Sequence, residues 1–255
     1  MIETILPAEA ATAEAFDDPP GLTLFPEEEA AIARAVAKRR REFTTTRACA
    51  RTALARLGLP PVPIVPGPRG APQWPAGVVG SLTHCAGYRA AAVARASTAH
   101  SVGIDAEPDQ ALPQGVLDLI ALREERLQLA ELAALWGGVH WDRLLFSCKE
   151  SVYKAWFPLA RCWLGFDQAE VSIDPDRSAF TARVLVPGPV VEGRELPGFR
   201  GRWLARDGLL LTAITVHASG PVEQVTACRQ HASLEPAGRA EVAHHHAYMP
   251  AAGAH

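Results

Sequence analysis

Two strand-like runs near the end of the chain restrict the fold most strongly. Residues 199–206 and 209–217 are rich in apolar and β-branched side chains, and only Asp207 and Gly208 separate them. An Asp-Gly pair suits a two-residue turn, so these runs predict an antiparallel hairpin. The fold therefore has to accommodate an antiparallel sheet.

Helix-like and strand-like segments alternate along the rest of the chain. A helix is expected from Pro26, where a proline precedes a run of glutamates. Helices followed by strands, twice over, predict an α+β fold made of two similar halves. Further helices are expected over 40–57, 112–135 and 142–157, strands over 62–65, 78–82, 89–94, 102–107, 170–173 and 179–186, a turn over 83–87, and a partly ordered lead-in over 1–20.

Composition sets the broad class of the protein. With 255 residues and 48% hydrophobic content the chain can bury a proper core, and its formal net charge of -3 argues against a general binder of nucleic acid. Five cysteines without a C-x-x-C pair favour reduced thiols over a disulfide scaffold or a zinc site. The start is acidic, unlike a signal peptide, and no apolar run is long enough to span a membrane. We expect a cytoplasmic protein without a membrane partner.

The expected strand over 102–107 carries two acidic side chains. Asp105 and Glu107 are two positions apart, so they leave a strand on the same side. Such a pair is costly to hold ionised unless a cation lies between the two carboxylates. Carboxylate oxygens suit Mg²⁺ or Mn²⁺. A solvated turn is the simpler interpretation of either residue alone.

A third carboxylate lies in the expected helix over 142–157. Glu150 and Lys154 are four positions apart, so they share one helix face, whereas Lys149 is expected to point away from it. Alone, such a pair is usually a surface contact of modest strength. Together with Asp105 and Glu107, in this order, it favours a site for a metal ion and a phosphate.

A basic row follows the expected helix over 40–57. Arg40, Thr44, Arg47 and Arg51 recur at helical spacing beside an apolar face. Guanidinium groups match the geometry of phosphate oxygens, so this row suits a phosphate grip. A solvated basic stripe explains it equally well, and the sequence leaves both interpretations open.

Several of these motifs, taken together, resemble the 4′-phosphopantetheinyl transferase superfamily, in its longer, single-chain group of surfactin and enterobactin type. The similarity covers roughly residues 25–217, and the last two motifs are its most specific part. In the order of the chain, the motifs are Arg40-Arg41-Glu42-Phe43 with Arg47 and Arg51, Gly70-Ala71-Pro72, Ser81-Leu82-Thr83-His84, Gly103-Ile104-Asp105-Ala106-Glu107, and Phe146-Ser147-Cys148-Lys149-Glu150-Ser151-Val152-Tyr153-Lys154.

The resemblance implies a reaction and the residues that perform it. Such enzymes move the phosphopantetheine arm of coenzyme A onto a serine of an apo acyl or peptidyl carrier protein and release adenosine 3′,5′-bisphosphate. By resemblance, Asp105, Glu107 and Glu150 hold Mg²⁺, with Mn²⁺ as a substitute. Glu150 takes the serine proton, directly or through a water, and Lys154 neutralises the pyrophosphate.

The resemblance also implies a binding site for coenzyme A between the two halves. His84 and Arg51 would hold the 3′-phosphate, with Arg40 or Arg47 nearby, and Thr83 would donate its hydroxyl to the pyrophosphate beside Asp105. The Gly70-Ala71-Pro72 loop would lie against the adenine, mostly through backbone atoms. Some relatives have a lysine where this chain has Ala71, and Arg69 is a candidate substitute for the side-chain phosphate contact of that lysine.

The resemblance predicts two halves related by a pseudo-twofold axis, in a chain that acts as a monomer. The expected parts are residues 1–105, residues 106–220 and a disordered tail over 221–255, whose histidine triplet receives no function.

Two other functions fit some of the same residues. A non-catalytic module that binds coenzyme A or a nucleotide would need the basic residues and His84 alone, and a metal-dependent phosphodiester hydrolase would use the carboxylates.

Overall fold

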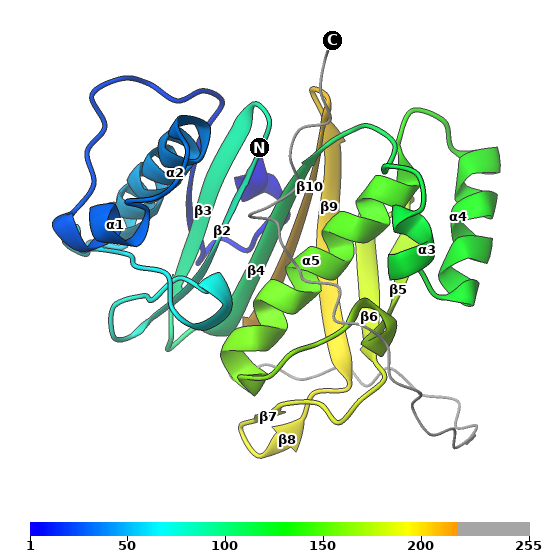
Figure 1. Ribbon diagram of the computed structural model, residues 1–255. Helices are drawn as coiled ribbons and strands as arrows, with labels where there is room; N and C mark the ends of the chain where they lie inside the picture. Colours follow the sequence, from blue (N-terminus) through cyan, green and yellow to red (C-terminus); the bar gives the residue numbers. More distant parts are fainter. Residues whose placement is uncertain (219–255) are drawn as a thin grey trace, which may run out of the picture. The chain divides into compact units, whose positions relative to one another are not determined.

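The computed structural model describes residues 1–218, which lie within one compact unit, Met1–Gly220 (Figure 1). The predicted tail over 221–255, with Cys228 and the histidine triplet, lies outside the described residues. The helices are α1 (Pro26–Ala31), α2 (Ala37–Arg56), α3 (Val116–Ile120), α4 (Arg123–Leu135) and α5 (Trp141–Ala160), with 3-10 turns η1 (Ile2–Ile5), η2 (Pro68–Gly70) and η3 (Phe166–Gln168). The strands are β1 (Ala11–Ala15), β2 (Val78–Cys85), β3 (Tyr88–Arg95), β4 (Ala99–Pro108), β5 (Ala169–Asp174), β6 (Ala179–Val184), β7 (Val190–Val191), β8 (Arg194–Glu195), β9 (Gly198–Arg206) and β10 (Leu209–His217).

Two antiparallel sheets and two long helices carry the fold. The first sheet has the strand order β1-β3-β2, and α2 packs on it. The second has the order β4-β10-β9-β6-β5, and α5 lies across β4 and β10 (Figure 1). The predicted α+β fold in two halves is confirmed, because each half pairs one sheet with one long helix.

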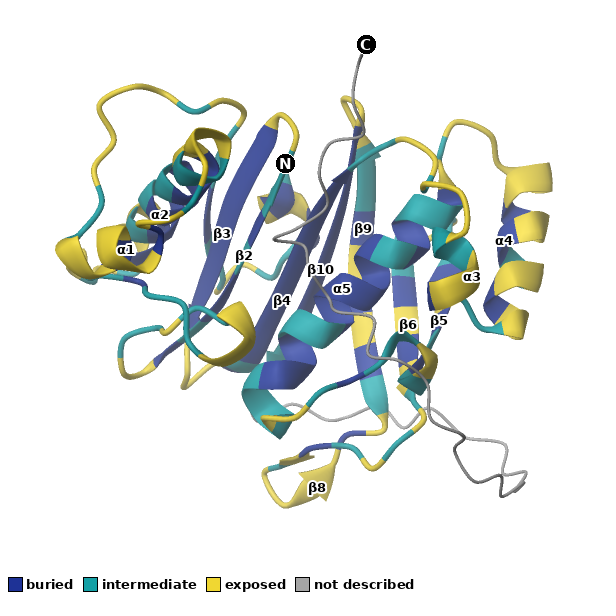
Figure 2. Ribbon diagram, in the orientation of Figure 1, coloured by how far each residue is buried: buried dark blue, intermediate teal, exposed yellow. Residues whose placement is uncertain are grey.

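Helical and strand periodicity account for the elements that the sequence predicts best. Leu144, Cys148, Val152 and Ala155 recur at helical spacing in α5, and all four are fully buried against the second sheet. The middle of α5 is accordingly dark in Figure 2, as are β4 and β10. The hairpin of β9 and β10 is confirmed, and its turn at Asp207-Gly208 has two positive φ angles, as a two-residue hairpin turn requires.

The predicted lead-in over residues 1–20 is wrong for most of its length. Strand β1 pairs with β3 in register from Ala11↔Val93 to Ala15↔Arg89. Its alanines carry little β propensity, so the sequence gives a weak strand signal there. Tertiary contacts compensate, because Glu14 accepts hydrogen bonds from the N-terminal ammonium and from the Tyr88 hydroxyl.

Two other expected elements also differ from the structure. Residues 62–65 do not form a strand, because prolines interrupt the segment and side chains take its hydrogen bonds: the Ile64 N–H donates to Glu28 and the Ile64 carbonyl accepts from Arg47. The expected helix over 112–135 is divided into α3 and α4. The Glu125 carboxylate accepts from the N–H of Leu122 at 2.7 Å and so starts a second helix.

The expected turn over 83–87 is shorter in the structure, and this matters for the site. Strand β2 extends through Cys85, and the turn to β3 uses Ala86 and Gly87, whose φ is +76°. Thr83 and His84 therefore lie in a strand, where successive side chains point to opposite faces. Thr83 is directed to β4, and His84 is directed to α2.

Strands β2 and β4 lie side by side but belong to different sheets, and we call the line between them the seam. Hydroxyl groups of β2 cross it: Ser81 Oγ accepts the N–H of Ile104 at 3.1 Å, and Thr83 Oγ1 accepts the N–H of Ala106 at 3.0 Å. These bonds satisfy backbone donors of β4 that a neighbouring strand would otherwise take. The predicted boundary between the halves, at residue 105, falls inside β4 and stays a prediction.

Close packing of α5 on β4 predicts a strong effect of one methyl group. A Cβ at Gly103 would lie 2.1 Å from the Ser151 carbonyl oxygen and 2.7 Å from the Ala155 nitrogen. We expect Gly103→Ala to lower the free energy of unfolding by about 3 kcal/mol, because helix and strand must move apart. Urea denaturation measures this. Gly137→Ala is the matched control, since a Cβ there meets open space, and an equal stability for both variants would contradict the prediction.

Candidate active site

The two carboxylates of β4 both face α5. Asp105 Oδ1 lies 2.7 Å from Lys154 Nζ, and Glu107 Oε2 lies 2.9 Å from Arg143 Nη1. Asp105 has 0% of its surface exposed and Glu107 has 4%. The strand spacing thus places both groups on one side of β4, as predicted, and each buried negative charge has a cationic partner from the same helix.

The Asp105 carboxylate, on the second sheet, is bound from the first sheet and from α5. Besides Lys154, the hydroxyl of Thr83 on β2 donates to its Oδ1 at 3.3 Å. Lys154 also donates to the Ile104 carbonyl at 3.1 Å, so the ammonium is held against β4 by two bonds. Asp105 is therefore the point at which the two halves and the long helix meet.

Arg143 is a site residue that sequence reasoning missed. Its guanidinium donates to Glu107 and to the carbonyls of Gln110 and Ala111. These hydrogen bonds hold the end of β4 against the start of α5. A usable signal was present, because Arg143 precedes Glu150 by seven positions and Lys154 by eleven and so belongs to the same helical row.

Glu150 lies on this row between Arg143 and Lys154, and it is 3% exposed. Since its neighbours along the row contact Glu107 and Asp105, the face that carries Glu150 is turned to β4. Within residues 1–218, no group of three or more His, Cys, Asp or Glu side chains is placed so that it could hold a metal ion. The predicted metal ligands share one region of the fold, and their convergence on one ion stays a prediction.

Lys149, next to Glu150, is directed away from this face, as predicted. Its ammonium lies 2.9 Å from the buried Glu125 and donates to the carbonyls of Phe166 and Ala169. Burial lowers the pKa of Lys149, and the negative charge of Glu125 opposes that shift. Lys149 thus fastens α5 to α4 and to β5.

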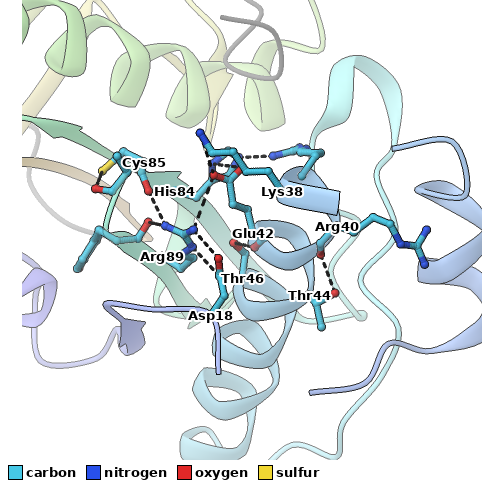
Figure 3. Close-up of polar contacts among 12 residues, drawn as sticks. Asp18, Lys38, Arg40, Glu42, Thr44, Thr46, His84, Cys85 and Arg89 are labelled. Carbon is cyan, nitrogen blue, oxygen red and sulfur yellow. Dashed lines mark hydrogen bonds and ion pairs between the residues drawn. The ribbon is translucent and has the colours of Figure 1, made fainter. Parts of the chain in front are cut away.

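His84 contacts α2 through a residue that the sequence did not single out. Arg39 Nη1 is hydrogen-bonded to His84 Nε2, and Glu42 Oε2 lies 3.9 Å from His84 Nδ1. Arg40, a predicted ligand, extends from the side of α2 away from His84 (Figure 3) and donates to the Ile32 carbonyl at 2.9 Å.

The other arginines of the predicted basic row bind the protein itself. Arg51 pairs with the fully buried Glu28 at 2.9 Å. Arg47 donates to the Ile64 carbonyl at 2.6 Å and stacks on Phe43, and burial lowers its pKa to about 10. In this conformation the row holds the segment around Glu28 and Ile64 against α2, and it is not a solvated stripe. Arg47 and Arg51 as phosphate ligands stay predictions.

The loop that carries Arg69, Gly70 and Ala71 reaches across to the second half. Ala71 packs against the hydrophobic core of that half, and the Arg69 guanidinium lies over the ring of Trp163. Arg69 and Gly70 both have positive φ, which gives the loop a sharp turn. This loop, which contains the 3-10 turn η2, therefore connects the two halves.

Two family profiles match the chain on either side of the seam. The profile described as 4′-phosphopantetheinyl transferase N-terminal domain matches residues 27–94, and that described as 4′-phosphopantetheinyl transferase superfamily matches residues 101–190. The chain is similar to the 4′-phosphopantetheinyl transferase Svp of Streptomyces mobaraensis, with 61% identity over 229 residues that cover 88% of this chain and 93% of the relative. The chain belongs to the 4′-phosphopantetheinyl transferase superfamily.

Further relatives of this transferase agree with that assignment. This chain is 50% identical over 224 residues to the 4′-phosphopantetheinyl transferase PptT of Mycobacterium tuberculosis. The alignment covers 85% of this chain and 98% of the relative. The chain is 52% identical over 222 residues to the 4′-phosphopantetheinyl transferase Npt of Nocardia iowensis, which covers 84% and 99%. The predicted superfamily and the predicted transferase activity are confirmed, whereas the surfactin and enterobactin subgroup stays a prediction.

None of the helices in residues 1–218 combines the length and apolar character of a membrane-spanning segment.

The buried ion pair beneath α5 predicts a purely structural effect. Lys149→Met leaves the Glu125 carboxylate buried without its cation, which should lower the free energy of unfolding by about 3 kcal/mol. Adding Glu125→Gln should restore much of the loss, because the isolated charge is removed while an amide oxygen remains to accept a backbone N–H. A double-mutant cycle from urea denaturation checks this. Equal stabilities of the single and double variants would contradict it.

Proposed function

We propose that this transferase moves the 4′-phosphopantetheine group of coenzyme A to a serine of an apo acyl or peptidyl carrier protein at the seam between its halves. The observation that supports this location is the contact of Asp105 with Lys154 of α5 and Thr83 of β2. It brings an anionic group, an ammonium and a hydroxyl together where the two family profiles meet. The ammonium and the hydroxyl suit a pyrophosphate, and the carboxylate suits a metal ion that would accompany it.

The serine oxygen attacks the β-phosphorus of coenzyme A, and the bond from that phosphorus to the bridging oxygen breaks. Adenosine 3′,5′-bisphosphate leaves with the electron pair of that bond. Glu150 accepts the serine proton, directly or through a water, because it is the carboxylate on the α5 row between Arg143 and Lys154. Lys154 exchanges part of its contact with Asp105 for the pyrophosphate and neutralises the charge that develops on the leaving group.

Asp105, Glu107 and Glu150 are the proposed ligands of Mg²⁺, for which Mn²⁺ would substitute. The donor set fits this ion, because all three groups are carboxylates and hard oxygen donors suit it. Lys154 and Arg143 contribute two positive charges against three negative ones, so the site retains a net negative charge that favours a cation. When bound, Mg²⁺ would offset negative charge on the pyrophosphate.

His84 is the proposed ligand of the 3′-phosphate of coenzyme A, and the structure adds Arg39 as its partner. Arg40, Arg47 and Arg51 remain candidates, although each would have to exchange a protein contact for the phosphate. The Gly70-Ala71-Pro72 loop is proposed to lie against the adenine, and Arg69 is proposed to supply a side-chain contact with phosphate. Since both halves belong to one chain, we propose that the enzyme acts as a monomer in the cytoplasm, without a nucleic-acid partner.

The proposed base gives a direct test of the chemistry. Glu150→Gln should reduce transfer at least about 1000-fold, because the amide neither accepts a proton nor carries a charge. Intact-mass spectrometry of an apo carrier protein incubated with coenzyme A measures the reaction. Glu131→Gln, an exposed substitution on α4, is the matched control. Loading of the carrier by the Glu150→Gln enzyme at the wild-type rate would contradict the assigned role.

The proposed metal site gives a second test. Chelation by EDTA should stop transfer, and added Mg²⁺ or Mn²⁺ should restore it. Paramagnetic resonance of Mn²⁺ provides a readout apart from activity, because binding broadens and reduces the signal of the free ion. In the Glu150→Gln enzyme this binding should weaken about ten-fold or more. Transfer that is insensitive to EDTA, or Mn²⁺ binding that is unchanged in the variant, would count against the three-carboxylate site.

A further inference from the structure

A buried carboxylate on α2 lies among four basic side chains, and no role has yet been assigned to it. Glu42 Oε1 lies 3.9 Å from Lys38 Nζ and 3.7 Å from Arg89 Nη2, and its Oε2 lies 3.9 Å from His84 Nδ1. Its negative charge also acts on Arg39, whose pKa burial lowers and Glu42 raises. Figure 3 shows Glu42 between Lys38, His84 and Arg89.

Arg89 fixes the inner side of this cluster. Its Nε and Nη2 donate to the two carboxylate oxygens of Asp18 at 2.9 and 2.8 Å, and its Nη1 donates to the Cys85 carbonyl. This bidentate pair holds the guanidinium in one geometry and neutralises it. Glu42 is thus held on one side by a rigid cation, while its other side faces His84 and the start of α2.

The hydrogen bond between Arg39 and His84 determines how the imidazole is protonated. A guanidinium only donates, so His84 Nε2 accepts, and the ring proton is on Nδ1, the atom nearest to Glu42. Glu42 therefore faces the N–H edge of His84 and attracts Arg39 at the same time. One carboxylate therefore acts on both His84, the proposed ligand of the 3′-phosphate, and its partner Arg39.

The cluster carries a net positive charge, which favours the binding of an anion. Lys38, Arg39 and Arg89 contribute three positive charges against the two negative charges of Asp18 and Glu42, with His84 neutral. Without Glu42, Lys38 and Arg39 of α2 would repel each other beside His84, because the carboxylate of Asp18 is already paired with Arg89.

We propose that Glu42 is a positioning residue for the 3′-phosphate of coenzyme A, holding Arg39 and His84 side by side before the phosphate arrives. This inference rests on the proposed function. This role predicts that removing the charge of Glu42 weakens phosphate binding, which is the opposite of the change expected from Coulomb attraction alone. Removing a negative charge near an anion site should tighten binding by Coulomb attraction alone, whereas losing the arrangement of the two donors should weaken it.

The decisive experiment compares two donors in the carrier-loading assay, coenzyme A and 3′-dephospho-coenzyme A. For Glu42→Gln we expect the KM for coenzyme A to rise about ten-fold with kcat within about two-fold, the size expected for losing one charged contact. The KM for 3′-dephospho-coenzyme A should stay within about two-fold, since that donor lacks the phosphate. Glu42→Asp, which keeps the charge on a shorter side chain, should lie between the wild type and Glu42→Gln.

Calorimetry gives a readout that needs neither transfer nor a carrier protein. Adenosine 3′,5′-bisphosphate should bind Glu42→Gln about ten-fold more weakly than it binds the wild type, while adenosine 5′-monophosphate should bind both equally. Glu27→Gln makes the same chemical change at an exposed position of α1 and should bind both nucleotides like the wild type.

The possible results separate the inference from the proposed function. If the wild-type protein loads no carrier protein, the proposed function fails. If it loads the carrier but Glu42→Gln binds coenzyme A as tightly as the wild type or more tightly, the positioning role is overturned. The role is also overturned if Glu42→Gln and Glu42→Asp weaken both donors equally, because Glu42 would then only support the fold.

Discussion

The structure of this transferase depends on one buried negative charge at the seam between its sheets. Asp105 has no exposed surface, and its carboxylate is bound by Lys154 from α5 and by Thr83 from β2. A buried carboxylate is tolerated only where cations and donors surround it. The long helix, the first sheet and the second sheet therefore have to converge at Asp105, and the groups proposed to act on the pyrophosphate are brought together by the same requirement.

The sequence predicted those elements whose periodicity is set by burial on one face. The helices α2 and α5 and the hairpin of β9 and β10 fall into this class. Strand β1 was missed, because alanines give little local signal and its pairing with β3 depends on residues far away in the chain. Residues 62–65 contain Val and Ile, which favour a strand, but proline interrupts them and the backbone groups of Ile64 bind the side chains of Glu28 and Arg47.

The same distinction holds for the candidate site. Asp105, Glu107, Glu150 and Lys154 could be found because fixed spacing on a strand and a helix decides which side they face. Arg39 and Glu42 could not be ranked above other charged residues, because their partners come from distant segments. Arg143 was missed although its spacing from Glu150 and Lys154 places it on the same helical row. The row of Arg40, Arg47 and Arg51 illustrates the limit: the spacing was right, but which neighbour the row faces is decided by the buried Glu28 and the Ile64 segment.

The hydroxyl bridges of Ser81 and Thr83 have a consequence for the diversity of such enzymes. A backbone ladder has nearly the same strength whatever its side chains, but here two amide groups of β4 depend on the identity of two residues of β2. Exchanging a hydroxyl for a methyl group at either position would loosen the junction between the sheets and leave each sheet intact. Natural variation at these two positions can therefore change how firmly the two halves are joined, without a change of topology.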